Sequence, residues 1–303
     1  MKRFLIHSVI FLSLVMGSMV FVLFQADGYT DPFYVRFTTP KQHSLIIGTS
    51  KAAQGIRPSI LEEVLPDHQV FNFAFTVAHS PFGPSYLNGI QRKVAEEANG
   101  GVFIITVDAW SIADGNEDPN DPEQFDENYS FLNNLKTVDA HPNIPYLLRY
   151  YQNYYAKIFD RDTVAFLHDD GWLEINTRMG EEVVQTRIKN KMSSLEKKTE
   201  INQLSETRLD YLYHTIELLQ QRGSVYLVRM PVHPELAEVD TSVIPHFEGI
   251  VNMVSHQTQT PYLDLYPENG RYQYTDGVHL TRESAEAVSR RIGLWIKTNP
   301  NHD

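Results

Sequence analysis

The chain has 303 residues, of which 42% are hydrophobic and 21% are charged, proportions typical of a folded domain rather than a disordered protein. This length is enough to bury a substantial core, and no linker separates two equal halves, so we expect one main domain. Acidic residues outnumber Lys and Arg by 38 to 26, and the basic residues form no cluster. Because tracking a phosphate backbone requires such a cluster, the composition argues against nucleic acid as a partner.

Cysteine is absent, which excludes disulfides, thiol catalysis and thiolate metal sites. An acidic stretch at 113–143 lacks the residue spacing of an EF-hand calcium loop, and we interpret it as a solvated insertion. We therefore expect neither a metal nor another cofactor.

The N-terminus carries a candidate membrane segment. Residues 4–24 follow Lys2 and Arg3, are mostly apolar and contain no Asp, Glu, Lys or Arg. A helix of roughly 17 to 25 residues spans a bilayer core. No small-x-small cleavage site precedes Gly28, so we favour a transmembrane signal anchor at 1–27 over a cleaved signal peptide. The two leading basic residues predict a cytoplasmic N-terminus and a periplasmic or extracellular remainder in a single-pass membrane protein.

The segment after the anchor, residues 28–43, is polar and contains two prolines, which predicts a short stem. Apolar runs that are bounded by turn signals then alternate with helical patterns. This alternation indicates a parallel sheet with helices on both faces. We predict strands at 44–48, 70–75 and 102–107, and helices at 58–65 and 84–98.

The alternation is interrupted at about 113–221, where we predict the acidic loop followed by helices at 144–159 and 181–221. The first of these helices is rich in tyrosine, which packing against the domain explains better than a glycan-binding platform does. We predict further strands at 225–230 and 262–265, with helices at 244–255 and 282–297. The expected fold is a three-layer, flavodoxin-like α/β sandwich at 44–300, with a parallel sheet of about five strands.

A candidate nucleophile follows the first predicted strand. Gly48-Thr49-Ser50 places a serine at the edge where parallel α/β sheets bind ligands. A serine in this position can present its hydroxyl and its backbone N–H to a substrate carbonyl, but it needs an adjacent base to react. Because Ser and Thr also commonly end strands and cap helices, the tripeptide alone is a weak signal.

A candidate base and its partner lie more than two hundred residues later. Asp276 and His279 are three residues apart, so in a tight turn both side chains can face the same way. The carboxylate would then accept a hydrogen bond from one ring nitrogen, while the other nitrogen takes the serine proton. An Asp-Gly turn followed by an exposed histidine explains the same residues equally well.

The serine after strand one, together with Asp-x-x-His before the last helix, resembles the SGNH (GDSL-like) hydrolase superfamily in residue type, order and position. The resemblance extends over about 44–297, although the motifs are short. It implies that Ser50 is the nucleophile and that Asp276 and His279 complete the triad.

Two positions depart from the family pattern. Where members carry Asn-x-Gly-x-x-Gly after strand two, this chain has Asn72 followed by Phe-Ala-Phe-Thr-Val. Where members carry Gly-x-Asn-Asp after strand three, Asp108 occupies the position of the Asn that donates to the oxyanion. A carboxylate there would oppose the developing negative charge, and losing one oxyanion donor costs about 100- to 1000-fold in rate.

Arg229 ends the fourth predicted strand on the same edge as Ser50. It could bind an anionic group of a substrate or pair with Asp108, which would offset the charge of that carboxylate. A plain salt bridge elsewhere explains Arg229 equally well.

These departures make the chain look more like the membrane-anchored SGNH branch that modifies cell-envelope polysaccharides, including proteins similar to the alginate acetylation and lipoteichoic acid D-alanylation factors. The resemblance implies esterase or O-acyltransferase chemistry on acyl groups, acetyl foremost, of an envelope glycan. It also implies a multi-spanning membrane acyltransferase as a candidate partner. The alternative is an inactive SGNH-like module that binds a glycan or scaffolds such a partner. A periplasmic binding protein is disfavoured because the sequence predicts no second α/β lobe.

Overall fold

A five-stranded parallel sheet forms the centre of the computed structural model, which describes residues 1–97, 99–161 and 164–300. The strand order is β2–β1–β3–β8–β9, and all neighbouring strands are parallel. This order is the flavodoxin-like one, so the predicted fold class is confirmed. The strands are β1 (Leu45–Ile47), β2 (Phe71–Asn72), β3 (Gly101–Thr106), β8 (Gly223–Arg229) and β9 (Tyr262–Asp264).

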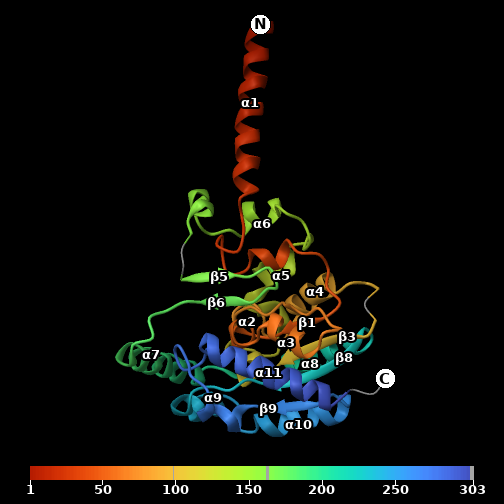
Figure 1. The fold of residues 1–303 in the computed structure, drawn as a ribbon, viewed down its shortest axis with the longest axis vertical. Coiled ribbons are helices and arrows are strands. Elements are labelled where there is room, and N and C mark those ends of the chain that lie inside the picture. Colours follow the sequence, from red (N-terminus) through yellow and green to blue (C-terminus); the bar gives the residue numbers. More distant parts are fainter. Residues whose placement is uncertain (98, 162–163, 301–303) are drawn as a thin grey trace.

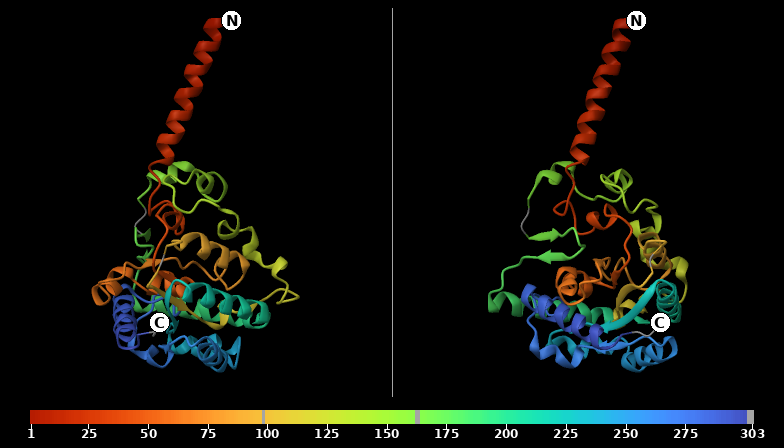
Figure 2. Two further views of the ribbon diagram at one scale, coloured as in Figure 1. Left: turned by 90° about the vertical axis from the view of Figure 1, so that its right-hand side faces the viewer. Right: turned by 45° about the vertical axis from the view of Figure 1, so that its right-hand side comes forward.

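Helices cover both faces of this sheet (Figures 1 and 2). Successive strand residues point to opposite faces, so Ile47 and Ile105 join one core cluster whereas Ile46 and Ile104 join the other. This burial on both sides explains why the strands are apolar throughout. The first face carries α4 (Pro84–Lys93), α8 (Glu206–Gln220) and α10 (Phe247–Thr258), and the second carries α2 (Ser50–Gly55), α3 (Pro58–Val64) and α11 (Arg282–Thr298).

The N-terminal helix α1 (Lys2–Leu23) projects away from the body (Figure 1). Its side chains are exposed until its last turn, and it is long and apolar enough to cross a membrane. A single-pass anchor and a signal sequence both fit these properties.

The segment predicted as a stem, 28–43, packs into the domain. It forms the 3-10 helix η1 (Tyr34–Phe37), in which Tyr34 and Phe37 are buried in the same core cluster as the sheet. Arg36 is fully buried and donates hydrogen bonds to the carbonyl oxygens of Pro32, Asn72 and Gly171. Because these contacts join it to distant parts of the chain, the segment belongs to the folded domain and is not a linker.

The insertion between β3 and β8 is less helical than predicted. The helix expected at 144–159 is two short elements, because the helix ends at Arg149 and a 3-10 turn follows only at Tyr155. The elements up to this point are η2 (Ala109–Ser111), β4 (Ala113–Asp114), η3 (Pro122–Gln124), η4 (Asp126–Tyr129), α5 (Phe131–Asn134), α6 (Ile144–Arg149) and η5 (Tyr155–Phe159).

The single helix predicted at 181–221 is also wrong. The chain forms α7 (Glu181–Thr199), then β7 (Gln203–Leu204), then α8, because β7 pairs with β4 and the Ser205 side chain caps α8 by accepting from the N–H of Arg208. Since α8 covers the sheet, the insertion ends before it. The remaining elements are β5 (Ala165–Leu167), β6 (Leu173–Ile175), η6 (Pro234–Leu236), α9 (Ala237–Ser242) and η7 (Tyr266–Arg271).

Candidate active site

Ser50 is the first residue of α2 and follows β1 by a two-residue turn. Gly48 in this turn has φ +147°, and a Cβ there would overlap the Thr106 side chain at the end of the neighbouring strand β3. Glycine therefore lets the backbone turn sharply between strand and helix. The turn places the Ser50 side chain at the carboxyl edge of the sheet, as the sequence predicted.

Asp276 and His279 lie in a tight loop whose ends pair through Tyr274 and Leu280. Gly277 has φ +91°, a left-handed conformation that favours glycine. One Asp276 oxygen, Oδ1, accepts the backbone N–H groups of Val278 and His279 at 3.0 and 2.9 Å. The carboxylate is thereby fixed by its own loop, and its second oxygen stays directed at the imidazole.

The three side chains form one hydrogen-bonded line. His279 Nδ1 lies 2.9 Å from Asp276 Oδ2, and His279 Nε2 lies 2.8 Å from Ser50 Oγ. Burial raises the pKa of Asp276, but hydrogen bonds from His279 and the charge of Lys191, 3.4 Å away, outweigh it and hold this pKa below its usual value. Because the carboxylate only accepts, the Nδ1 proton faces Asp276 and Nε2 is free to accept from Ser50.

These side chains open into a cavity of about 100 Å³. Helix α7, from the insertion, forms one wall with Lys191, Ser194, Leu195 and Lys198. Ile188 of the same helix is buried in a cluster with Val278, which lies between Asp276 and His279. The insertion therefore contributes part of the site and does not only extend the surface.

A second group of polar side chains lies beside the triad. Lys51, the residue after Ser50, is buried with its Nζ 3.0 Å from Asp240 Oδ1 and 3.6 Å from Asp108 Oδ2. Trp110 Nε1 also donates to Asp240, at 2.9 Å. Burial lowers the pKa of Lys51, but the charges of Asp108 and Asp240 outweigh this effect and raise it. Lys51 therefore stays protonated between the two carboxylates, and we call this group the Lys51 cluster.

Asp108 lines the cavity, as expected from its position after β3, and both its oxygens are engaged. Oδ1 accepts the Ser111 N–H at 2.9 Å, and Oδ2 accepts the Thr49 hydroxyl at 3.2 Å. Lys51 offsets part of the negative charge of Asp108, because it is shared with Asp240. Sequence reasoning missed Lys51. Its position next to the candidate nucleophile, on a helix that must pack on the sheet, is a signal for a buried cation that needs carboxylate partners.

Asn72 is not brought to this site. Its amide donates to the carbonyl oxygens of Ala52 and Ile56, each at 2.9 Å, and its Oδ1 accepts the Ala74 N–H. It is fully buried and holds α2 against β2. Within the stretch from Asn72 onward that was expected to supply an oxyanion donor, Val77 is the residue that lines the cavity.

Arg229 is not part of this cavity either. It ends β8, lies 3.8 Å from Asp264 and stacks on the ring of Tyr266 with its guanidinium carbon 3.7 Å from the ring centre. The pairing with Asp108 considered from the sequence is therefore wrong, because Lys51 occupies that position.

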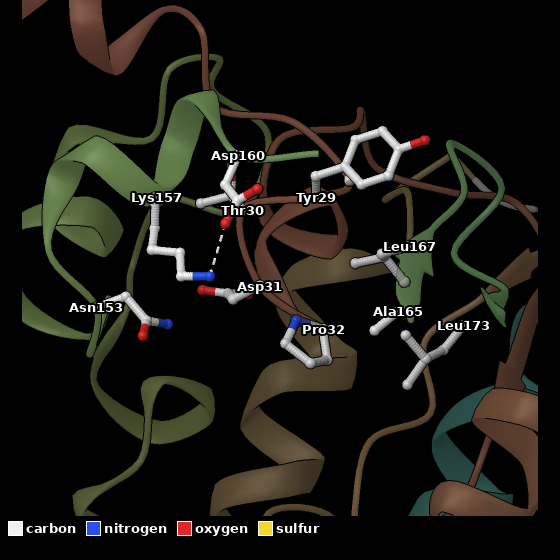
Figure 3. A pocket seen from close by; sticks show the side chains of 11 residues that line it. Tyr29, Thr30, Asp31, Pro32, Asn153, Lys157, Asp160, Ala165, Leu167 and Leu173 are labelled. Carbon is white, nitrogen blue, oxygen red and sulfur yellow. Dashed lines mark hydrogen bonds and ion pairs between the residues drawn. The ribbon is translucent and has the colours of Figure 1, made fainter. Parts of the chain in front are cut away.

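A larger cavity, of about 260 Å³, lies elsewhere, between the segment after α1 and the β5 region (Figure 3). Its wall includes Tyr29, Asp31 and the ion pair of Lys157 with Asp160, at 2.7 Å. None of the triad residues lines it. Its larger size therefore does not make it the better candidate for the chemistry.

No protein-family model matches the chain, and no curated protein matches it. Among solved structures, it is similar to Est24, a carbohydrate acetylesterase from Sinorhizobium meliloti, with 9% identity, a TM-score of 0.41, and coverage of 86% of this chain and 100% of that one. A carbohydrate acetylesterase family member from the same organism matches with 9% identity and a TM-score of 0.39, over 84% and 98% of the two chains. The chemistry proposed below rests on the side chains of the site and not on these likenesses.

Proposed function

We propose that the chain is a serine-dependent esterase or O-acyltransferase with Ser50 as its nucleophile. The observation that carries this proposal is the continuous line from Ser50 Oγ through His279 to Asp276 at the edge of a cavity. This geometry has the hydrogen-bond lengths and the order of roles of a Ser-His-Asp triad.

In the proposed reaction, Ser50 Oγ attacks the carbonyl carbon of an acyl ester while His279 Nε2 takes the hydroxyl proton. The tetrahedral intermediate collapses when His279 returns this proton to the leaving alcohol oxygen, which breaks the ester bond and leaves an acyl-Ser50. Water or a sugar hydroxyl then attacks the acyl group, again through His279, and releases a carboxylic acid or a new ester. Asp276 holds the imidazole and stabilises its cation.

The negative charge on the carbonyl oxygen needs compensation. Among the described residues, none accepts a hydrogen bond from the Ser50 backbone N–H, which is at the first position of α2. We assign this N–H as one oxyanion donor. Lys51 adds a positive charge between Asp108 and Asp240 and offsets part of their negative charge.

We place this domain outside the cytoplasm, anchored by α1, and we assign an acyl ester of a cell-envelope glycan as its substrate. Support comes from the apolar length of α1 and from the resemblance of the Ser50, Asp276 and His279 pattern to membrane-anchored SGNH proteins. The acyl-enzyme is an intermediate of both hydrolysis and transfer. To separate the two reactions, the release of free acid is measured without an acceptor and again after a glycan is added; a hydrolase releases acid in both cases, whereas a transferase passes the acyl group to the glycan.

A fluorophosphonate probe tests the nucleophile, because it labels a serine only when a base activates it. We expect labelling of the full-length protein and its loss in Ser50→Ala. Ser194→Ala is the matched control. Ser194 lines the same cavity, but the hydroxyl that lies against His279 Nε2 is that of Ser50. Labelling that persists in Ser50→Ala would refute the proposal.

Two observations favour the alternative of an inactive module that binds a glycan or a membrane acyltransferase. Asp108 stands where a neutral donor is expected, and Asn72 is turned into the core. That module would hold a glycan in the cavity without reacting with the probe. Glycan binding by a full-length protein that the probe does not label would support it over the enzyme.

A further inference from the structure

The end of α1 and the residues that follow it are fixed on the folded body. Leu23 and Ala26 are buried at 2% and 1% exposure, in contrast to the exposed turns before them. The Phe24 ring meets His141 edge-on, with ring centres 6.2 Å apart, and α1 contacts η5. The direction in which α1 leaves the body is therefore set by packing and not by a free linker.

Around this exit point the chain exposes apolar and aromatic side chains. They belong to α6, η5 and the turn between them, which lie at the end of the body where α1 emerges (Figure 1). We call them the collar, and they are exposed by between 40% and 67%: Ile144, Leu148, Tyr154, Tyr155 and Phe159.

The collar is exposed although its backbone is firmly held. Tyr146, Leu147 and Ile158, from the same two elements, are buried at 1% or less in the main core. The Tyr146 hydroxyl donates to Asp31 at 2.9 Å, which ties α6 to the segment that follows α1. The exposed side chains therefore stand on an anchored surface that keeps a constant position relative to α1.

We propose that the collar rests in the interfacial layer of the bilayer that α1 crosses. Tyrosine suits that layer because its ring is apolar while its hydroxyl reaches water and headgroups, and Leu, Ile and Phe gain by leaving water. The exposed Arg149, at the end of α6, is placed to meet lipid phosphates. A lipid surface is the occupant because a membrane-spanning α1 brings lipid to this end of the body.

This inference rests on the proposed membrane placement of α1 but not on the proposed chemistry. It sets the orientation of the domain, because two points of contact, the helix and the collar, prevent the body from swinging. Helices α7 and α9, which border the catalytic cavity, lie toward the part of the body away from α1 (Figure 1). These helices, and the cavity that they border, are therefore held on the part of the body away from the bilayer.

The absence of native cysteine allows one environment-sensitive fluorophore to be attached at a single chosen position. We would label Leu148→Cys in the collar and Leu294→Cys on α11, which have similar exposures of 55% and 52%. Each full-length protein is reconstituted in phosphatidylethanolamine–phosphatidylglycerol vesicles that contain lipid with a nitroxide near the headgroup. We expect at least threefold stronger quenching at 148 than at 294.

Equal quenching at the two positions would overturn the collar proposal. Flotation of the same samples with the vesicles separates the two ways to fail. A protein that floats with the vesicles but shows no quenching at 148 would contradict the collar proposal alone. A protein that does not float would contradict the membrane placement of α1 as well. Adding Tyr154→Glu and Phe159→Glu to the Leu148→Cys protein should lower quenching toward the level at 294, with thermal unfolding measured to show that the fold is kept. Unchanged quenching in that folded variant would also contradict the proposal.

Discussion

The two halves of the proposed catalytic cavity are built on opposite principles. The triad half is partly open: the side chains of His279 and Asp276 are 13% and 21% exposed and are joined by hydrogen bonds. The other half, Lys51 with Asp108 and Asp240, is closed, since each side chain is at most 8% exposed. Groups that exchange protons with a substrate must be reachable, whereas charges that only shape the field act more strongly when water is excluded. Changes in the first half should therefore mainly lower activity, and changes in the second should cause a larger loss of stability.

Asp276→Asn should lower activity by about 10,000-fold, because an amide at this position favours the wrong imidazole tautomer. The measurement is kcat/KM on an aryl acetate together with the rate of fluorophosphonate labelling. Asp264→Asn is the matched control, because this carboxylate pairs with Arg229 outside the cavity. A loss of less than tenfold in Asp276→Asn would mean that the triad geometry is not used.

Lys51→Met should lower the free energy of unfolding by about 3 to 5 kcal/mol, because it leaves two buried carboxylates without their cation. Urea unfolding measures this change. Lys198→Met, which removes an exposed lysine from the same cavity, should change stability by about 0.5 kcal/mol or less.

The double variant Lys51→Met with Asp240→Asn should recover part of that loss, because one of the two unpaired charges is removed.

Ser50→Ala should leave stability within about 1 kcal/mol of the parent. If Ser50→Ala proved as destabilising as Lys51→Met, the contrast between the two halves would fail.

The pH dependence of stability sharpens the same contrast. Burial raises the pKa of Asp276, but the contacts of this carboxylate with His279 and Lys191 lower it by a larger amount. The pKa of Asp276 in the folded chain is therefore below its pKa in the unfolded chain. The unfolded chain then binds more protons, and stability rises with pH between the two values. The contribution of Asp276 is present above about pH 4 and is lost as the pH falls below it. Unfolding curves of the parent and Asp276→Asn should therefore converge in acid, and a constant gap would contradict this.

Lys191→Ala should have the smallest effect, about a 2- to 5-fold loss of kcat/KM. Its ammonium lies 3.4 Å from Asp276 but is one-third exposed, so solvent screens much of its charge. Lys189→Ala, at an exposed position of the same helix, provides the control. An effect as large as that of Asp276→Asn would show that Lys191 contacts the substrate directly.

Local patterns predicted the sheet and the edge at which Ser50 meets the Asp276–His279 loop. Strands buried on both faces are recognisable as continuous apolar runs, and residues at strand ends converge because the strands are parallel. Ser50 and the Asp276–His279 loop follow from these two facts together with the chemistry that the residues need.

Features that depend on distant contacts were not predictable in this way. The break between α7 and α8 occurs because β7 pairs with β4, some ninety residues earlier, within a stretch that is otherwise helical in pattern. The partners of Lys51 are likewise in the third strand's loop and in α9. The role of Asn72 was predicted wrongly for the same reason, since its acceptors lie on α2 and on Ile56, the residue that follows it.

Arg36 has a practical consequence for anyone who wants a soluble form of this protein. Its guanidinium bonds the Asn72 carbonyl, and the Asn72 amide in turn holds α2, which begins with Ser50. A fragment that starts at residue 44 would lose Arg36 together with Tyr34 and Phe37, and would expose the core that they cover. A fragment that begins near Ala26, shortly after α1, keeps these contacts and with them the position of Ser50.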